Sequence, residues 1–434
     1  MNAMNPMRHA GRSAVVAMSF AVSAVFLFSP AQSRALPNPA AAYCERLGYA
    51  YRVEKTAQGA RGIVTVAPGV EFDAMDFYRG KVGSDYAIGA RYGHETKCRV
   101  EKKNGYTVEH AVCVAPGDSA DSKDAIPLVS FMEMVGEPLQ IGQDLIRQNA
   151  PSPSSGSFDQ ALEGAKRQAA KAVTSFDWRN HNGHSYIGPV RDQGNCGSCY
   201  SFAASAAAEG TYNVANGLYD ANCIDLSESF VIWCIGRLPE YNSHFFGCDG
   251  ADYDYAELGA LCRVGATYEA NYPYTERDPG SCTHWDDPVI KFKDWSRIEC
   301  SDIDGIKAAI MTYGVLDAAV YVSDDFSAYY GGVYSDAYTA CDDSPCYYKS
   351  TDHAIALVGW DDNPPEGGSG VWILRNSWGS SWGENGYMRI GFTSARVACE
   401  ATYLTYGPVA VTGHVAVAVS PTAGSWSFTT RPAG

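Results

Sequence analysis

A cysteine in the middle of the chain lies where nucleophilic chemistry is favoured. Cys199 follows the Gly- and Asn-containing stretch 193–198, and the Ala-rich stretch Ala203–Glu209 after it predicts a helix. Unpaired amides give the N-terminal end of a helix a partial positive charge. A thiol placed there ionises more readily, and the thiolate is the nucleophile. Cys199 is therefore a candidate nucleophile.

A thiolate needs an oriented acid–base partner, and the sequence offers one far downstream. His353 opens an apolar, strand-like run that ends at Trp360. Asn376 follows a second apolar run, Trp372–Arg375, and precedes Trp378. An Asn carbonyl can hold an imidazole N–H, and a neighbouring Trp can keep water away from that bond. We expect the two strands to bring His353 and Asn376 to Cys199.

Several motifs resemble the papain family of cysteine peptidases, the cathepsin group. The stretch Cys196–Tyr200 fits the family signature Cys-Gly-Ser/Ala-Cys-Trp/Tyr. The motifs occur in the family's order at Asp177–Arg179, Gln193–Ala203, Leu226–Glu228, Gly247–Gly250, Tyr272–Tyr274, Asp352–Ala354 and Asn376–Tyr387. The resemblance spans about residues 175–409 and implies an α+β, papain-like two-lobed fold. A helical lobe would begin with the Cys199 helix, and a β-barrel-like lobe would carry His353 and Asn376.

The resemblance implies a role for each residue of the cleft. Cys199 would be the nucleophile and His353 its base and acid, as a thiolate–imidazolium pair that Asn376 orients. The Gln193 side-chain amide and the Cys199 backbone N–H would form the oxyanion hole. Substrate would contact Gly250, Ala251, Asp352, Ala354, Trp378 and Leu404. Ala251 departs from the family's usual Gly, and its methyl group could weaken or re-aim substrate binding. No cofactor and no metal are expected.

The chain has 14 cysteines, which imply disulfides in an exported protein. Eleven of them follow residue 190, and this odd number leaves one thiol spare, as a nucleophile requires, if the other ten pair with one another. The resemblance implies the bridges Cys196–Cys248, Cys234–Cys282 and Cys346–Cys399. Two further bridges could form among Cys223, Cys262, Cys300 and Cys341. Cys98 and Cys113 flank a predicted hairpin and could pair, which leaves Cys44 without an obvious partner.

The N-terminus predicts an exported protein. Positive residues precede the uncharged, mostly apolar run Ala14–Phe28, and small residues then offer cleavage after Ala31 or Ala35. We interpret residues 1–35 as a signal peptide. The alternative is an uncleaved anchor, but the run of 15 residues is short for a span, which needs about 20. We expect a secreted or periplasmic protein with no stable membrane span after cleavage.

The next segment, residues 36–149, contains a weak internal repeat. Arg52–Lys55 recurs as Arg99–Lys102, and Val66–Gly69 recurs as Val114–Gly117. We predict two related β-hairpin units, which form a candidate pro-region. The opening motif Asn38–Cys44 resembles that of a small bacterial domain family of unknown function, which carries no activity.

Three further segments complete the predicted organisation. Residues 150–171 form a Pro/Ser/Gly linker and a candidate processing segment. Its basic residues Lys166, Arg167 and Lys171 mark either a processing site or one face of a polar helix. The peptidase domain would span 172–409, and residues 410–434 would be a C-terminal extension.

Composition and charge exclude other function classes. The 434 residues are 46% hydrophobic and 19% charged, which supports a packed core and excludes a disordered chain. A net charge of −16 without a Lys/Arg run makes nucleic acid a poor candidate partner. His181 and His184 lack further ligands at metal-site spacing. The acidic residues Asp249, Asp252 and Asp254 lack the calcium-loop pattern, which favours a solvated loop.

The family resemblance implies an exported endopeptidase that is made as a zymogen and that acts through a Cys199 acyl-enzyme. Its partners would be protein or peptide substrates, with the N-terminal region as a candidate autoinhibitor. One alternative is a non-cleaving peptide-binding protein on the same scaffold. Another is an exopeptidase of the family. Members that release C-terminal dipeptides carry a loop with paired histidines, and Gly250–Cys282 contains no histidine. We therefore expect internal cleavage.

Overall fold

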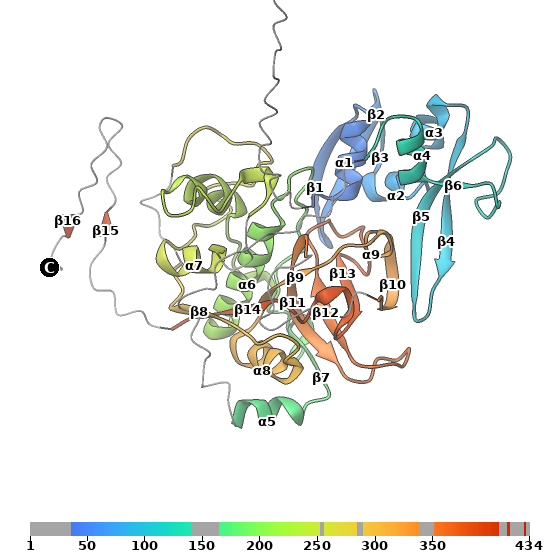
Figure 1. Cartoon of the computed structure of the whole chain (residues 1–434). Helices are drawn as coiled ribbons and strands as arrows, with labels where there is room; N and C mark the ends of the chain where they lie inside the picture. Colours follow the sequence, from blue (N-terminus) through green and yellow to red (C-terminus); the bar gives the residue numbers. More distant parts are fainter. Residues whose placement is uncertain are drawn as a thin grey trace, which may run out of the picture. The chain divides into compact units, whose positions relative to one another are not determined.

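The computed structural model describes residues 36–139, 165–251, 256–283, 290–337 and 351–407, and two short strands nearer the C-terminus (Figure 1). The predicted signal peptide, the linker at 150–157, Asp252 and Asp254 lie outside the described residues. Most of the predicted C-terminal extension does too, except strands β15 (Val415–Ala416) and β16 (Thr429–Thr430), which pair with each other. In the described part of the chain, no helix has the length and apolar character needed to cross a membrane.

The first unit of the N-terminal region is a three-stranded antiparallel sheet with a helix on either side in sequence. Its elements are α1 (Pro39–Arg46), β1 (Ala50–Thr56), β2 (Gly59–Ala67), β3 (Val70–Asp73) and α2 (Ala74–Tyr78). Asn38 caps α1 by accepting a hydrogen bond from the Ala40 N–H, and Pro39 occupies the first helical turn, where its fixed φ is favourable. These two residues therefore fix the direction in which the chain enters α1.

The second unit has the same order of helices and strands after one additional short helix, η1. Its two long strands form the second hairpin that the sequence repeat predicts. Its elements are η1 (Ser84–Tyr86), α3 (Ile88–Arg91), β4 (Glu95–Lys102), β5 (Tyr106–Val114), β6 (Ile126–Pro127) and α4 (Leu128–Met134). The repeated Arg-Val-Glu-Lys motif lies in the first strand of each hairpin, and the Val-Ala-Pro-Gly motif ends the second strand. Each unit is therefore a hairpin with helices, which is more than the hairpin alone that the sequence predicts.

The helical lobe is built around α6 (Cys199–Asn216), an Ala-rich helix that is buried over most of its length. The lobe also contains η4 (Asp220–Asn222), η5 (Phe230–Cys234), η6 (Ile235–Arg237), η7 (Gly247–Asp249) and α7 (Ala256–Arg263). The short η3 (Trp178–Asn180) precedes α6, and its Trp178 packs in the core of the β lobe. Small Ala side chains let neighbouring elements approach this helix closely, so it serves as a core helix. The prediction that Cys199 lies where a loop enters a helix is confirmed.

The β lobe forms one sheet with the second hairpin of the N-terminal region. Its strand order is β4-β5-β10-β13-β12-β11-β9-β14-β8, with β7 paired to β11 and β6 to β5. The lobe's strands are β7 (Ser175–Asp177), β8 (Asp294–Arg297), β9 (Leu316–Val320), β10 (Tyr329–Tyr334), β11 (His353–Asp361), β12 (Val371–Arg375), β13 (Tyr387–Gly391) and β14 (Ala401–Thr405). The helices α5 (Ala165–Lys171), α8 (Ile303–Tyr313), α9 (Asp324–Ser327) and η8 (Ser394–Arg396) accompany them. Strands β11 and β12 are almost entirely buried, which explains their continuous apolar runs.

The described residues form two large hydrophobic cores. The helical-lobe core includes Tyr200, Phe230 and Leu404. The larger core joins side chains of the N-terminal region, such as Tyr43, to side chains of the β lobe, such as Trp382. The predicted α+β architecture of a helical lobe and a β lobe is confirmed. The N-terminal region, however, shares its packing with the β lobe and so is anchored to it.

Candidate active site

Cys199 is the first residue of α6 and is almost completely buried. It is a thiol rather than half of a disulfide. Its side chain packs with Ala203, one turn further along the helix, and with Ala354, the residue after His353. The 18-residue helix directs its positive end at this position, which favours a thiolate there. The helix and strand β11 thus bring the predicted nucleophile against Ala354, the residue that follows the predicted base.

His353 and Asn376 meet as the sequence predicts. His353 begins β11, Asn376 directly follows β12, and the two strands pair antiparallel. The Nε2–H of His353 donates to Oδ1 of Asn376 across 2.7 Å. With the hydrogen on Nε2, the neutral imidazole keeps its lone pair on Nδ1, which has no hydrogen-bond partner among the described residues. This nitrogen is the one available to accept the thiol's proton.

Trp378 covers the imidazole. Its ring stacks on that of His353 with 4.7 Å between centroids, and both side chains are buried. Burial lowers the pKa of His353 to about 4, although the hydrogen bond to Asn376 acts to raise it. The thiolate–imidazolium pair that the family resemblance implies stays a prediction.

Gln193 is fully buried, and both polar atoms of its side-chain amide are hydrogen-bonded. Its Oε1 accepts a hydrogen bond from the Ser377 hydroxyl across 2.6 Å. Its Nε2 donates to the carbonyls of Cys196 and Leu36, each at 2.8 Å. The following Gly194 has a φ of +60°, and a Cβ there would lie 2.2 Å from Glu276. Glycine at this position lets the loop turn so that the amide is aimed into the cleft.

The structure places the remaining predicted contact residues as follows. Asp352 offers its backbone carbonyl to the N–H of Leu36 at 3.4 Å, and Ala354 lies beside Cys199. Gly250 has a φ of 102°, which suits its residue type. The methyl group of Ala251 belongs to the buried helical-lobe core, as does Leu404 on β14. Their roles in substrate binding stay predictions.

Two of the implied disulfides are present, Cys196–Cys248 and Cys234–Cys282. The first ties the loop before α6 to η7. Cys399 is disulfide-bonded, as is Cys300, but Cys341 and Cys346 lie outside the described residues. The Cys346–Cys399 bridge therefore stays a prediction.

Two other cysteine expectations are wrong. Cys98 and Cys113 are both thiols, because the β4–β5 register sets Cys98 opposite Ala111 and Cys113 opposite Thr96. The odd number of cysteines after residue 190 does not single out Cys199, since Cys223 and Cys262 are thiols as well. Burial raises the pKa of Cys223 to about 11 and that of Cys262 to about 12. What distinguishes Cys199 from these two thiols is its position at a helix N-terminus, and not the odd number of cysteines.

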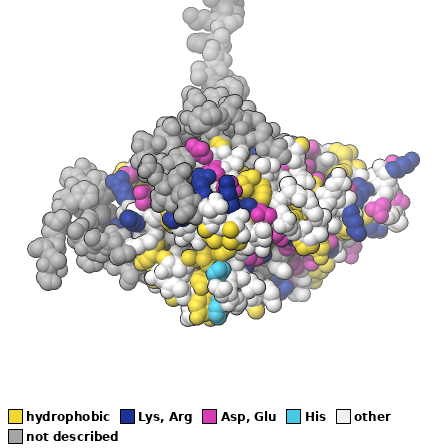
Figure 2. All heavy atoms as spheres, turned by 90° about the horizontal axis from the view of Figure 1, so that it is seen from below, with side chains coloured by type: hydrophobic (Ala, Val, Ile, Leu, Met, Phe, Trp, Pro, Cys, Tyr) yellow, Lys and Arg dark blue, Asp and Glu magenta, His cyan; other side chains and the backbone are white. Residues whose placement is uncertain are grey.

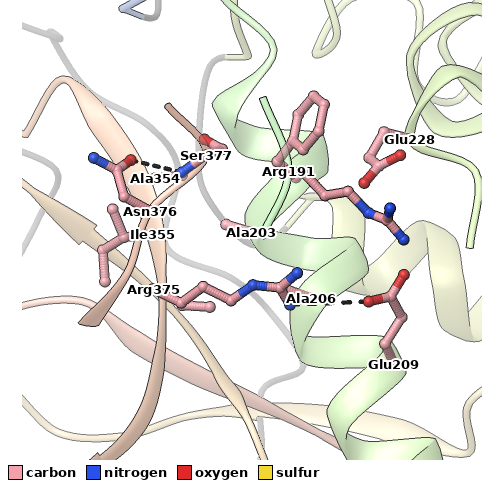
Figure 3. Close-up of a pocket in the computed structure, with 12 residues that line it drawn as sticks. Arg191, Ala203, Ala206, Glu209, Glu228, Ala354, Ile355, Arg375, Asn376 and Ser377 are labelled. Carbon is pink, nitrogen blue, oxygen red and sulfur yellow. Dashed lines mark hydrogen bonds and ion pairs between the residues drawn. The ribbon is translucent and has the colours of Figure 1, made fainter. Parts of the chain in front are cut away.

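A small pocket lies between α6 and the β lobe, beside Asn376 (Figure 3). Its lining residues are Arg191, Phe202, Ala203, Ala206, Glu209, Glu228, Ala354, Ile355, Ala356, Arg375, Asn376 and Ser377. Arg375 and Glu209 point toward each other, with Nη1 and Oε2 at 3.9 Å. Sequence analysis missed this buried charged group, although a Glu within an Ala-rich helix was a usable signal.

The segment that enters the cleft was also missed. Leu36 is almost completely buried, and its carbonyl accepts the Gln193 amide hydrogen bond. The side chain of Asn38 donates to Oδ1 of Asp192 at 2.8 Å, and Tyr51 donates to Oδ2 of the same carboxylate at 2.7 Å. Local sequence signals do not report such contacts, because they join residues more than 130 positions apart.

The metal and charge predictions concern the surface. Among the described residues no group of His, Cys, Asp and Glu is arranged to hold a metal ion. His184 instead contacts Asp220 at 2.8 Å, and His181 packs on Phe176 and Trp178. Acidic and basic side chains are interspersed on the face in Figure 2.

The comparisons with known proteins agree with this geometry. The family model described as papain family cysteine protease matches residues 172–408, and that of a domain of unknown function, DUF333, matches residues 35–81. Cysteine proteinase 1 of Entamoeba histolytica is 34% identical over 241 residues, which are 55% of this chain and 69% of that protein. Pro-cathepsin H of Mus musculus is 33% identical over 218 residues, 50% of this chain and 60% of the relative.

Fruit bromelain of Ananas comosus is 33% identical over 228 residues, 52% of this chain and 57% of the relative. This chain thus spans less than two thirds of the length of two of these three relatives. Among solved structures, digestive procathepsin L 3 of Tenebrio molitor larval midgut has a TM-score of 0.46 at 25% identity, covering 60% of this chain and 75% of that one. The first family model matches more than half of the chain and spans the whole cysteine–histidine–asparagine site. The chain belongs to the papain family of cysteine proteases.

Proposed function

We propose that the chain is an exported cysteine endopeptidase, made as a zymogen, that hydrolyses peptide bonds through a Cys199 acyl-enzyme. The observation that carries the proposal is the 2.7 Å hydrogen bond between His353 Nε2 and Asn376 Oδ1. It fixes the tautomer that leaves Nδ1 as a base, next to a cysteine at the positive end of α6.

The arrangement supports a two-stage hydrolysis. In the first stage Nδ1 of His353 takes the Cys199 proton, and Sγ attacks the substrate carbonyl carbon. The carbonyl oxygen becomes negative and accepts a hydrogen bond from Gln193 Nε2. The imidazolium then gives its proton to the leaving nitrogen as the C–N bond breaks. In the second stage a water loses a proton to His353 and attacks the thioester, which releases the acid and restores the thiol.

The N-terminal region would serve as the pro-region. Its strand β5 pairs antiparallel with β10 of the β lobe, and the buried Arg79 donates to the backbone carbonyls of Ser381 and Tyr329, each at 3.0 Å. Such contacts support a region that stays bound to the peptidase until it is cut away.

We place the activating cut N-terminal to α5. Arg167 forms an ion pair with Asp302, and Lys171 forms one with Asp304, so α5 is held against α8. These contacts favour the helix-face interpretation of the basic residues over a processing site. A cut between residues 139 and 165 would leave α5 on the mature enzyme.

An internally quenched peptide with both ends blocked tests the proposal. The substrate is offered to the reduced chain after limited trypsin treatment, beside the Cys199→Ala variant. Hydrolysis by the wild type alone supports an endopeptidase. Hydrolysis only of peptides with a free terminus would instead identify an exopeptidase. Peptide binding without any hydrolysis would identify a binding protein on this scaffold. Export is tested separately, by an N-terminus at residue 32 or 36 in periplasm or medium.

A further inference from the structure

The first described residues of the N-terminal region reach the cleft, where Leu36 and Asn38 are hydrogen-bonded to the peptidase. The N–H of Leu36 donates to the Asp352 carbonyl at 3.4 Å, and the Leu36 carbonyl accepts from Gln193 Nε2 at 2.8 Å. The N–H of Asn38 donates to the Gly194 carbonyl at 3.0 Å. Pro37 lies between them and has no N–H to donate.

These hydrogen bonds give the segment a direction. The oxyanion donor holds the oxygen of the carbonyl that the thiolate attacks. Since Gln193 Nε2 holds the Leu36 oxygen, Leu36 occupies the acyl position and the bond at the point of attack joins Leu36 to Pro37. Asn38 then lies on the leaving-group side, where its contacts to Gly194 and Asp192 are found. The chain therefore runs through the cleft in the polarity of a substrate.

We infer that Leu36, Pro37 and Asn38 form a substrate-like plug that inhibits the peptidase, with Pro37 protecting the Leu36–Pro37 bond and Asn38 locking the segment onto Asp192. This inference rests on the proposed peptidase function and names its inhibitory element. The plug is bound as a substrate would be, and its resistance to cleavage lies in one residue.

Proline protects the bond by its ring. For cleavage, Cys199 Sγ would bond to the Leu36 carbonyl carbon, and the C–N bond to Pro37 would break as His353 protonates the nitrogen. The proline nitrogen carries Cδ where other residues carry a hydrogen. This carbon crowds the attacked carbonyl and the approach of the imidazole to the nitrogen. An ordinary residue at position 37 removes this obstacle and turns the plug into a substrate.

Asn38 anchors the plug on a buried carboxylate. Its Nδ2 donates to Asp192 Oδ1 at 2.8 Å, while its Oδ1 caps α1 through the Ala40 N–H. Asp192 also accepts from the Tyr51 hydroxyl and from the Gly194 N–H. The carboxylate is thus satisfied by the plug and the N-terminal region together. A second carboxylate at position 38 would face it directly and repel it.

The first experiment uses Asn38→Asp in the full chain. Asp caps a helix as well as Asn does, so α1 is retained while the contact with Asp192 becomes repulsive. We expect hydrolysis of the blocked peptide by the uncut chain to rise at least tenfold. The matched control is Asn104→Asp, which makes the same charge change in the exposed β4–β5 turn and should change activity less than twofold. Tyr51→Phe, which keeps every charge, should give a smaller rise.

The second experiment uses Pro37→Ala and reads the N-terminus rather than the activity. After incubation in reductant, N-terminal sequencing should find a chain that begins at residue 37, and Cys199→Ala in the same background should abolish it. The control Pro39→Ala changes a proline of the same segment two positions away. It keeps the protected bond and should give no such N-terminus.

Each chain is also activated with trypsin and its reactive cysteine counted with an irreversible peptide probe. The plug proposal is wrong if Asn38→Asp is as inactive as the wild type before activation and Pro37→Ala is not cut after Leu36. The peptidase proposal holds in that case if all the activated chains hydrolyse the peptide equally. If no activated chain hydrolyses peptide, the peptidase proposal fails and the inhibitory role falls with it. A rise with Asn38→Asp together with cleavage after Leu36 in Pro37→Ala supports the plug.

Discussion

Gln193 Nε2 donates one hydrogen bond to the Leu36 carbonyl and another to the Cys196 carbonyl, each across 2.8 Å. The amide has two hydrogens, so both are in use while the N-terminal region is bound. A substrate carbonyl must displace Leu36 to reach this donor. The same amide that would stabilise a transition state is therefore the one that holds the chain's own segment.

Gln193→Ala should remove one oxyanion donor from the activated enzyme. We expect kcat to fall about 10²- to 10³-fold with KM little changed, because the bond is strongest when the oxygen carries charge. Steady-state kinetics on the blocked peptide, corrected for the number of reactive cysteines, measures this. Ser377→Ala removes only the hydroxyl that orients the amide and should cost less. A loss below threefold for Gln193→Ala would contradict the assigned role.

Asn376→Ala should release the imidazole of His353. The carbonyl oxygen of Asn376 accepts from both His353 Nε2 and the Ser377 N–H, so the variant loses the acceptor that fixes the tautomer. We expect kcat to fall about 10²-fold, at the lower end of what a positioned acid–base group contributes. The pH dependence of kcat should shift as well. Asn363→Ala, in an exposed loop, is the matched control and should leave both unchanged.

The binding of the N-terminal region should weaken as pH rises. Burial raises the pKa of Glu276 to about 6, and the charges of Asp192 and Glu45 add to this, while the Asn195 N–H acts against it. Glu45 belongs to the N-terminal region and also contacts the Asn195 side chain. When the region leaves, the charge of Glu45 is lost, so the pKa of Glu276 falls from its value in the bound state.

A carboxyl whose pKa is raised in the bound state favours binding fully below the ordinary pKa and loses this contribution as pH rises through 6. The activity of the uncut chain, divided by that of the cut enzyme at the same pH, should therefore rise between about pH 4.3 and pH 6.5. Glu276→Gln should flatten this ratio. If the ratio falls with rising pH in the wild type, the predicted direction of the pH dependence is wrong.

Arg375→Ala should destabilise the fold, because it removes one partner of a buried ion pair. Arg375 lies 3.9 Å from Glu209 and donates to the Pro189 carbonyl at 2.6 Å. Burial raises the pKa of Glu209 to about 7, and its neighbours Arg191 and Arg375 oppose this. Removing one partner of a buried pair typically costs about 3–5 kcal/mol of unfolding free energy. Urea unfolding in the Cys199→Ala background measures it, and combining Arg375→Met with Glu209→Gln should recover part of the loss. An unchanged unfolding midpoint for Arg375→Ala would contradict this.

The catalytic elements could be predicted from the sequence because their signals are local. The Ala-rich run after Cys199 became α6, and the apolar runs at His353 and before Asn376 became β11 and β12. The internal repeat likewise predicted the two hairpins of the N-terminal region. In each case the periodicity or composition of a short window determines the element.

The contacts between regions could not be predicted in this way. The pairing of β5 with β10 joins the edge of one hairpin to a strand more than 200 residues later, and sequence patterns do not select edge partners. The disulfide expected between Cys98 and Cys113 failed because a hairpin's register decides which residues face each other. The plug at Leu36 depends on where the whole N-terminal region is anchored, and that is set by a shared core.

The role of Cys199 as the nucleophile is tested most simply by measuring the intact mass of the activated chain after reaction with a thiol-reactive peptide probe. The thiols of Cys223 and Cys262 remain on the activated chain, and burial raises their pKa values, so they should react slowly. We expect one probe per wild-type chain, one per Cys223→Ala chain and none per Cys199→Ala chain, and only the Cys199→Ala chain should lose peptide hydrolysis. Labelling of Cys199→Ala at the wild-type rate, or hydrolysis by that variant, would contradict the assignment of Cys199 as the nucleophile.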